Sequence, residues 1–190
     1  MELLLGVFTA FGLSASAGLN AYIPLLVIGV IAHYTAWITL SVPWDLLANP
    51  WVLIVLGILV IIEMLADKIP AVNHINDAIQ TFIRPAAGAI AFAASAKVIT
   101  DINPVLALVC GLLVSGSVHA VKSVAVRPAV TAATGGAGNV PVSIAEDIFS
   151  TVMSILAIVI PIMVAIILVL AITLFILWRQ RRREKANQHI

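Results

Sequence analysis

Residues 63–85, E-M-L-A-D-K-I-P-A-V-N-H-I-N-D-A-I-Q-T-F-I-R-P, place a group of charges within an otherwise apolar sequence. Before this stretch, residues 3–62 contain a single carboxylate, Asp45, and a single histidine, His33. Glu63 and Asp67 are four residues apart, so on a helix they share a face about 5 to 6 Å from one another. Two carboxylates this close at the end of an apolar helix should hold a proton, a cation or a basic partner. The stretch therefore indicates a site.

Composition defines the class of protein. The 190 residues are 62% hydrophobic and 10% charged, and the mean hydropathy is +1.15. A soluble domain would carry about 25% charged residues, so the sequence predicts an integral membrane protein. The net charge is only +1, and basic residues are not grouped with aromatic ones as in nucleic-acid-binding proteins, so we expect no nucleic-acid partner.

The first apolar segment, which runs from Leu3 to about Ile31, has a break near its middle. Gly18, Asn20 and Pro24 lie within seven residues there. Proline removes the backbone hydrogen bond to the carbonyl four residues back, which here belongs to Asn20. Unwound backbone at membrane depth is tolerated only against protein or a wet cavity. We expect either half of a binding site or a packing kink between closely spaced helices.

Four more apolar segments follow. Residues 51–64, 104–118 and 143–178 predict membrane helices, the last with a kink at Pro161. The small-residue-rich segment 85–97 is only about 12 residues long before its lysine, which is short for a lone span, so we expect a re-entrant or enclosed piece. The sequence predicts an all-α integral membrane protein with four to five transmembrane helices, a broken first helix and one short or re-entrant segment.

The C-terminal residues 179–190 include the basic run R-Q-R-R-R-E-K. Because positive loops and tails stay on the cytoplasmic side, this run predicts a cytoplasmic C-terminus in a bacterial inner membrane. We therefore divide the chain into one transmembrane domain, residues 1–178, and a basic tail, residues 179–190.

The longest irregular stretch is expected at residues 126–141, which are rich in Gly and Ala. Ser143-Ile-Ala-Glu146 matches a capping box and predicts the start of the final helix. Residues 128–145 carry no charge, which is unlike a flexible polar linker. We expect this loop to fold back toward the charged site and to present glycine backbone amides beside Arg127.

Two short similarities recur within the chain. His74 precedes Arg84-Pro-Ala by ten residues, and His119 precedes Arg127-Pro-Ala by eight. Gly-Leu-Asn-Ala-Tyr-Ile-Pro24 and Gly-Asn-Val-Pro141 form a second loose pair. Such pairs are typical of an inverted repeat, although chance similarity in a low-diversity apolar sequence explains them equally well.

Several of these motifs occur together in a known family. The set Gly18-Leu-Asn-Ala-Tyr-Ile-Pro, Glu63-x3-Asp-Lys-Ile-Pro, Arg84-Pro-Ala-Ala-Gly, His119-Ala-Val-Lys and Ser143-x2-Glu-Asp resembles a family of small bacterial membrane proteins classed as a domain of unknown function. The resemblance covers nearly the whole chain. It implies a polytopic membrane protein and supplies no activity.

Known catalytic patterns are absent from the sequence. The four histidines have no zinc-ligand spacing, and the chain contains no His-Glu-x-x-His motif. Thr134-Gly-Gly-Ala-Gly138 lacks the Gly-Lys-Ser/Thr ending of a P-loop. We therefore expect no cofactor and leave a metal open. The weaker interpretation is an intramembrane enzyme, in which Asp67, His119 and Lys122 would act on a lipid or prenyl phosphate, or a flippase-like protein that handles the same lipids.

The ionisable residues favour a small transporter or channel with a charged intramembrane site. Carboxylates would take a coupling proton or ion, and basic side chains an anionic solute. A structural membrane scaffold is the third interpretation, because buried charges must be paired in any case. Expected partners are the lipid bilayer and a small solute or lipid, with homo-oligomerisation left open. The candidate substrate or ion site comprises Asn20, Glu63, Asp67, Lys68, Asp77, Arg84, His119, Lys122, Arg127, Glu146 and Asp147.

Overall fold

The computed structural model describes residues 2–95 and 103–161, and the separate positions 166, 169, 170, 172–175, 177 and 179. The described part is all-helical and contains no strand. Its elements are α1 (Glu2–Leu19), α2 (Tyr22–Tyr34), the 3-10 helix η1 (Trp44–Ala48), α3 (Pro50–Ala66), α4 (Pro70–Ser95), α5 (Pro104–Val121), the π-helix η3 (Lys122–Val126), α6 (Arg127–Thr134) and α7 (Asn139–Val159). Residues 180–190 of the expected tail lie outside the described residues.

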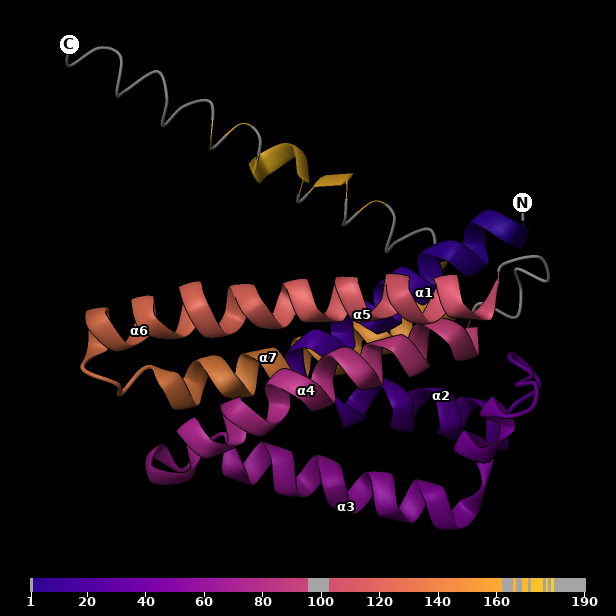
Figure 1. The fold of residues 1–190 in the computed structure, drawn as a ribbon, viewed down its shortest axis with the longest axis horizontal. Coiled ribbons are helices and arrows are strands. Elements are labelled where there is room, and N and C mark those ends of the chain that lie inside the picture. The colour runs from indigo at the N-terminus through magenta and orange to yellow at the C-terminus, as the bar shows by residue number, and fades with distance from the viewer. Residues whose placement is uncertain are drawn as a thin grey trace.

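The first apolar segment forms two helices that run in opposite directions. The predicted break is confirmed, because α1 ends at Leu19 and α2 begins at Tyr22. Figure 1 shows that the chain reverses there, so that α2 returns toward the end of the bundle at which α1 starts. Leu13 of α1 and Ile28 of α2 accordingly pack in one apolar cluster. The break thus makes a short helical hairpin with its tip inside the bundle.

Helix α4 corrects the expectation of a separate short segment at residues 85–97. Residues 85–95 are the second half of a continuous helix of 26 residues, which is about 39 Å long at 1.5 Å per residue; residues 96 and 97 lie outside the described residues. Pro85 lies within this helix and cannot donate to the carbonyl of Thr81. The small side chains that follow it allow close packing, since Ala87, Ala91 and other alanines of α4 are buried.

The stretch expected to be irregular, residues 126–141, is mostly helical, so that prediction is wrong. Helix α5 continues through the π-helix η3 into α6, and only residues 135–138 form a turn. Pro128 explains the π-helix, because it cannot donate to the carbonyl of Val124 and its ring displaces that carbonyl. The backbone N–H of Arg127 instead donates to the carbonyl of Lys122, five residues back.

Helix α7 begins earlier than the capping-box motif predicts. It starts at Asn139, and Ser143 therefore lies inside the helix. The Ser143 hydroxyl donates to Asp67 at 3.4 Å and does not cap the helix. The sequence motif was misread because a serine bonded to another helix leaves the same pattern as a capping serine. Helix α7 ends at Val159, and Ile160 has left the helical conformation, with φ −138° and ψ 70°, next to the predicted kink at Pro161.

The bundle is held together by close helix contacts. Where α4 crosses α5, a Cβ atom added to Gly111 would clash with the carbonyl oxygen of Gly88, and one added to Gly88 would clash with Ser115. Ser115 also donates to the backbone carbonyl of Arg84 at 2.7 Å. The absence of side chains at the two glycines therefore sets how closely these helices approach and fixes Ser115 against α4.

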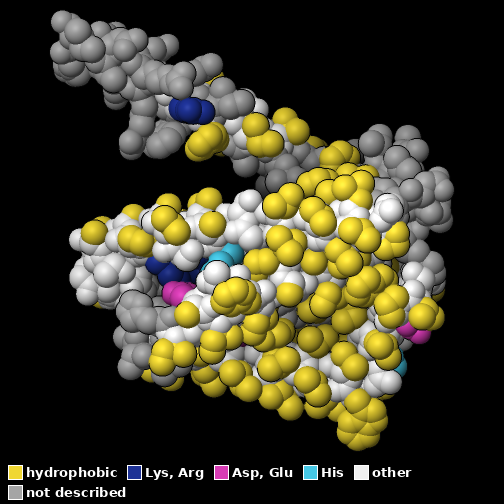
Figure 2. Space-filling view, in the orientation of Figure 1, with side chains coloured by type: hydrophobic (Ala, Val, Ile, Leu, Met, Phe, Trp, Pro, Cys, Tyr) yellow, Lys and Arg dark blue, Asp and Glu magenta, His cyan; other side chains and the backbone are white. Residues whose placement is uncertain are grey.

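The outer surface is largely apolar. Figure 2 shows hydrophobic side chains over most of the visible face, and Trp51, Ile61, Phe82 and Leu113 are each more than half exposed. Two helical stretches, Pro104–Thr134 and Asn139–Val159, are long and apolar enough to cross a membrane by length and composition. Soluble proteins seldom expose contiguous apolar patches of this extent, so the surface suggests association with a membrane.

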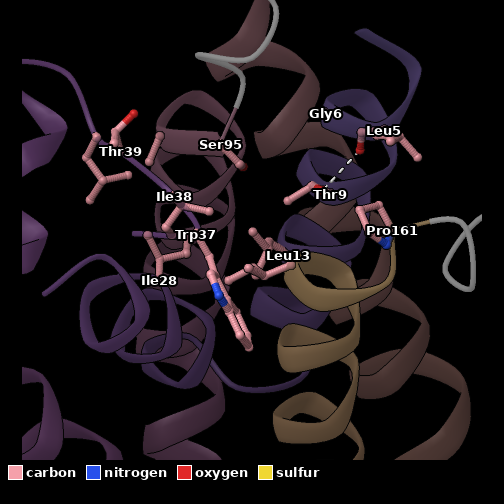
Figure 3. A pocket seen from close by; sticks show the side chains of 13 residues that line it. Leu5, Gly6, Thr9, Leu13, Ile28, Trp37, Ile38, Thr39, Ser95 and Pro161 are labelled. Atoms are coloured by element: carbon pink, nitrogen blue, oxygen red, sulfur yellow. Dashed lines mark hydrogen bonds between the residues drawn. The ribbon is translucent and has the colours of Figure 1, made fainter. Parts of the chain in front are cut away.

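One cavity lies at the end of the bundle where α1 starts and α7 ends. It has a volume of about 380 Å³ and is lined by apolar side chains such as Leu13, Ile28 and Trp37, with three hydroxyl residues, Thr9, Thr39 and Ser95. Thr9 is turned toward backbone, as Figure 3 shows for its contact with Leu5. Its hydroxyl also lies 2.8 Å from the carbonyl oxygen of Ala157. That carbonyl lacks its usual helical donor, because Pro161, four residues later, has no backbone N–H.

Candidate functional site

The charged side chains meet at the tip of the α1–α2 hairpin. They come from the end of α3, the first half of α4, the α5–α6 junction and the first half of α7, and the neutral side chain of Asn20 joins them from the break. Figure 2 shows basic, acidic and histidine side chains gathered in a hollow between α5–α6 and α4. We call this set the charged cluster; its ionisable members are Glu63, Asp67, Lys68, Asp77, Arg84, His119, Lys122, Arg127, Glu146 and Asp147.

Side chains satisfy the backbone at the helix break. The Asn20 side-chain oxygen accepts from the backbone N–H groups of Tyr22 and Ile23, both at 3.2 Å. Glu63 accepts from the N–H of Ala21 at 3.0 Å, and Lys122 donates to the carbonyl of Leu19 at 3.1 Å. Because an unpaired buried backbone group is costly, these contacts allow the chain to reverse inside the bundle.

Asp67 is the centre of the cluster. It is 4% exposed and directly follows α3 as its C-terminal cap residue. Its Oδ1 accepts from the Asn76 amide at 2.6 Å. Its Oδ2 lies close to four further side chains: Arg127 Nη2 at 3.0 Å, Lys122 Nζ at 3.4 Å, Ser143 Oγ at 3.4 Å and Arg84 Nη2 at 3.5 Å. One carboxylate thus ties together α4, α5 with η3, α6 and α7.

The two Arg-Pro-Ala motifs therefore converge on the same group. Arg84 and Arg127 both approach Asp67 Oδ2, although they come from different helices. Arg127 also pairs with Asp77 at 2.7 Å. The inverted repeat that these motifs suggested remains a prediction, and the side chain of His74, which belongs to the first motif, lies outside the described residues.

Glu63 and Arg84 form a fully buried pair. Arg84 donates to Glu63 Oε1 through Nη2 at 2.9 Å and through Nε at 3.1 Å, and neither side chain is exposed. Glu63 and Asp67 are both buried, and each lies beside a basic partner, as the sequence analysis expects: Glu63 beside Arg84 and Asp67 beside Lys122. Such a pair is stable only while both partners are present, because one charge left alone in the interior is destabilising.

The contacts of His119 assign its protonation. Arg84 Nη1 lies 3.1 Å from His119 Nδ1, and a guanidinium can only donate, so Nδ1 accepts. The proton of the neutral ring is then on Nε2, which lies 3.2 Å from the Thr81 hydroxyl; Thr81 in turn donates to the backbone carbonyl of Asp77. This tautomer is inferred from the network. Both ring nitrogens are engaged, so His119 is held as a neutral structural link.

The acidic turns of α7 provide the last two pairs. Asp147 accepts from the Asn20 amide and from Lys68, both at 3.0 Å. Glu146 lies 2.8 Å from Lys122. Helix α7 therefore contacts both the hairpin tip and the α5–α6 junction through neighbouring residues.

Carboxylates outnumber fixed cations in the cluster. Among the described side chains, five carboxylates face four fixed cations in its ion pairs, which leaves one excess negative charge when His119 is neutral. Two buried oxygens, Asp77 Oδ1 and Gln80 Oε1, have no hydrogen bond in the described part, and a third, Glu146 Oε2, has only its ion pair with Lys122. Because buried polar groups are normally hydrogen-bonded, these oxygens indicate that the cluster can accept a further proton, cation or donor.

A second cavity, of about 320 Å³, adjoins the cluster. Lys122 and Glu146 lie in its wall together with Leu19, Ser117, Val118, Val121 and Val126. Val121 is 60% exposed and bounds the cavity where it meets the surface. The cavity reaches the Lys122–Glu146 pair; neither Glu63 nor Asp67 lines it.

All eleven residues expected at the site take part in this set of contacts, since Asn20 joins Asp147 and the ten ionisable residues form the cluster. The sequence interpretation missed Asn76, Thr81, Ser115 and Ser143, which hold the charged groups in place. Their helical spacing was available as a signal: Asn76, Gln80 and Arg84 recur every four residues along α4, and Ser143, Asp147, Ser150 and Ser154 recur every three or four along α7.

The glycine-rich turn does not close over the site, which corrects that expectation. Gly135 has a φ of 62° and Gly136 a φ of 94°, a region that glycine adopts without strain. A Cβ atom at either position would meet nothing within 4 Å. The turn therefore stands at the tip of the α6–α7 hairpin, away from the cluster, and only the two ends of that hairpin reach the charges.

The described residues offer no ready metal site. No group of three or more His, Cys, Asp or Glu residues in the described part is arranged to hold a metal ion. Cys110, which is partly buried in α5, lies in an apolar cluster with Phe92.

Comparison with known proteins gives the family. No curated protein and no solved structure matches the chain. The family model described as "Domain of unknown function (DUF4126)" matches residues 7–181, which confirms the resemblance to a family of uncharacterised activity. The chain belongs to this family, the domain of unknown function DUF4126.

Proposed function

We propose that this protein is a polytopic membrane transporter whose charged cluster takes up a proton or small cation as the coupling ion. The observation that carries the proposal is the excess of carboxylates and unpaired acceptor oxygens in the cluster, at the tip of a helix break. Ionisable groups at membrane depth are expensive and usually functional. Transporter sites are commonly built at such interrupted helices.

The proposed membrane arrangement has four crossing elements and one hairpin. Helices α3, α4, α5–α6 and α7 run the length of the bundle between its two ends (Figure 1). Helices α1 and α2 start and end at the same end of the bundle, so this hairpin would enter the membrane without crossing it. The re-entrant element that the sequence suggested at residues 85–97 is therefore assigned in this proposal to α1–α2.

The arrangement of ion pairs favours a moving charge over a fixed scaffold. Asp67 has three cationic side chains within 3.5 Å, those of Arg84, Lys122 and Arg127. If a solute drew one of them away, the other two would still neutralise the carboxylate. A pair on the outside of the cluster, Lys68 with Asp147, is partly exposed, with 24% exposure at the lysine. A scaffold would need only matched pairs, and the excess acceptors have no role in it.

An enzyme acting on a lipid or prenyl phosphate is the weaker candidate. His119 has both nitrogens engaged, which leaves no free base at that position. The cations that would hold a phosphate, Arg84, Lys122 and Arg127, are each already paired with a carboxylate. We therefore also set aside the expected preference for an anionic solute in favour of a cation.

The test uses reconstituted protein. Proteoliposomes on a solid-supported membrane are exposed to proton, sodium and potassium gradients with a panel of charged solutes. We predict currents that depend on one cation gradient and fall at least about tenfold in Asp147→Asn, because the variant lacks the carboxylate charge that pairs with Lys68. A tenfold loss corresponds to about 1.4 kcal/mol. Asp45→Asn, a change at an exposed carboxylate outside the cluster, is the matched control and should behave as wild type.

Equal currents in wild type, Asp147→Asn and empty liposomes would contradict the transporter proposal. Loss of folding in Asp147→Asn, seen by size-exclusion chromatography and melting temperature, would instead assign Asp147 a structural role.

We also propose a bacterial inner-membrane location with the C-terminus in the cytoplasm. The basic run after residue 178 supports it through the positive-inside tendency. A cysteine placed after Arg183 should resist a membrane-impermeant maleimide in intact spheroplasts and react after lysis. Labelling before lysis would contradict this orientation.

A further inference from the structure

We propose that the cavity beside Glu146 binds an apolar amine, a molecule that carries a protonated primary or secondary amine on a hydrocarbon body. This names the solute class of the proposed transporter, so it rests on that function only for the transport step. Binding can be tested alone. The argument comes from the wall of the cavity and from the unequal state of its two charged residues.

The basic residue of the cavity has no donor to spare. Three oxygens surround Lys122 Nζ: Glu146 Oε2 at 2.8 Å, the Leu19 carbonyl at 3.1 Å and Asp67 Oδ2 at 3.4 Å. An ammonium has three N–H donors, so an added anion would have to displace one of these partners. Lys122 is also 2% exposed, which leaves little of it accessible from the cavity.

The acidic residue is in the opposite state. Among the described residues Glu146 has a single partner: Lys122 Nζ lies 2.8 Å from its Oε2, and no described residue donates a hydrogen bond to its other oxygen, Oε1. An ionised carboxylate has about four lone-pair positions. A ligand that enters the cavity therefore meets unfilled acceptors, and the complement of an unfilled carboxylate is an N–H group with a positive charge.

The rest of the wall specifies the body of the ligand. Leu19, Val118, Val121 and Val126 give it an apolar lining. The Ser117 hydroxyl donates to the carbonyl of Leu113 at 2.7 Å, so it offers a ligand only an acceptor oxygen. The volume of about 320 Å³ falls at the lower end of the range of roughly 300 to 1,000 Å³ for small-molecule sites. The cavity thus suits a short hydrocarbon chain with one cationic end.

The binding experiment uses octylammonium as the probe, titrated into the purified full-length protein in dodecyl maltoside with calorimetric detection. Glu146→Gln keeps the shape of the side chain and removes its charge. A hydrogen bond to a charged group contributes about 1.5 to 3 kcal/mol, so octylammonium should bind about 10 to 150 times more weakly to Glu146→Gln. Wild type and variant are titrated in the same micelles, which cancels partitioning of the probe into detergent.

Ligand controls separate head from body. Methylammonium has the charge without the chain, octyl glucoside the chain without the charge, and octyl phosphate the opposite charge. The proposal expects octylammonium to bind more tightly than all three. Equal binding of octyl glucoside would reduce the site to an apolar cavity, equal binding of methylammonium would remove the hydrocarbon requirement, and tighter binding of octyl phosphate would reverse the sign; each result overturns the proposal.

A pair of tryptophan variants tests the location without touching a charge. Val121→Trp places bulk in the wall of the cavity, whereas Val124→Trp places the same bulk on a neighbouring exposed position that does not line it. Octylammonium should lose most of its affinity for Val121→Trp and keep it for Val124→Trp. Equal affinities for the two would contradict the assigned cavity.

Lipid discs distinguish the source of the amine. Octylammonium is titrated into protein in phosphatidylcholine discs with and without phosphatidylethanolamine, whose headgroup is itself a primary amine. Weaker binding with phosphatidylethanolamine would support a lipid amine as the ligand, and unchanged binding would support a soluble one. Octylammonium binding without any transport current would contradict the transporter proposal alone, and current from another solute without octylammonium binding would contradict this inference alone.

Discussion

The two ends of the α1–α2 hairpin show how the same helices can build opposite interiors. At the tip, near Asn20, polar backbone is satisfied by charged side chains from other helices. At the open end, near Thr9, hydroxyl groups serve backbone carbonyls and the cavity that remains is apolar. At the open end one threonine satisfies the backbone next to a proline, whereas at the tip Glu63 and Lys122 satisfy the backbone of the helix reversal. The need to satisfy this backbone explains those two charges and not the excess of carboxylates around them, for which the proposed function supplies a role.

The largest effect is expected from breaking the buried pair at the tip. Arg84→Met leaves Glu63 as an uncompensated buried charge and removes the contacts to Asp67 and His119. Breaking such a pair by removing one partner costs about 3 to 5 kcal/mol. Reversible unfolding in mixed micelles measures the loss. A loss of less than about 1 kcal/mol, the scale of a surface pair, would mean that the pair is solvated.

The next largest effect on stability is expected at the crossing between α4 and α5, which lies between the charged end and the apolar end of the bundle. Gly111→Ala places a Cβ atom against the Gly88 carbonyl, whereas at Gly116 of the same helix a Cβ atom would lie 3.6 Å from Pro85 in ordinary contact. Overpacking costs about 1 to 3 kcal/mol, and replacing a helical glycine without a clash gains up to about 1 kcal/mol. Gly111→Ala should therefore unfold more readily than wild type and Gly116→Ala less readily. Equal stabilities would contradict the close crossing.

The smallest effect is expected at the apolar end. Thr9→Val keeps the shape of the side chain but removes the hydroxyl contact to the Ala157 carbonyl. A partly buried hydrogen bond contributes about 0.5 to 1.5 kcal/mol, so the melting temperature should fall by a few degrees. Thr39→Val, at an exposed position of the same cavity lining, is the control and should remain unchanged. A larger effect than that of Arg84→Met would reverse the order of the two ends.

Much of the fold could be predicted from the sequence. Composition gave the helical class, and the four-residue spacing of Glu63 and Asp67 located the buried carboxylates. Proline and asparagine located the helix break. The angle at the break could not be predicted, because a run of small residues permits a kink and a reversal equally well. The reversal depends on Glu63 and Lys122, which reach the break from distant parts of the chain.

The errors in the sequence interpretation share a physical cause. The two threonines within residues 127–134 and the glycines that follow have low helix propensity, which predicts an irregular segment. The segment is nevertheless helical as α6, because it continues the preceding helix. Ser143 looked like a cap because local patterns cannot reveal that its hydroxyl bonds Asp67 in another helix. Local signals thus located most elements, whereas the partners of buried polar groups needed the structure.

The most direct test of the central claim, that the charged cluster works as a site and not only as a brace, is the double variant Glu63→Gln/Arg84→Met. Replacing both members of a buried pair is often neutral for stability, so the double variant should unfold close to wild type while Arg84→Met alone does not. Currents of the double variant and of wild type are compared in proteoliposomes of the same composition under the same cation gradient. We predict that the stable double variant loses the cation-dependent current; a double variant that is as stable as wild type and carries the full current would contradict the claim.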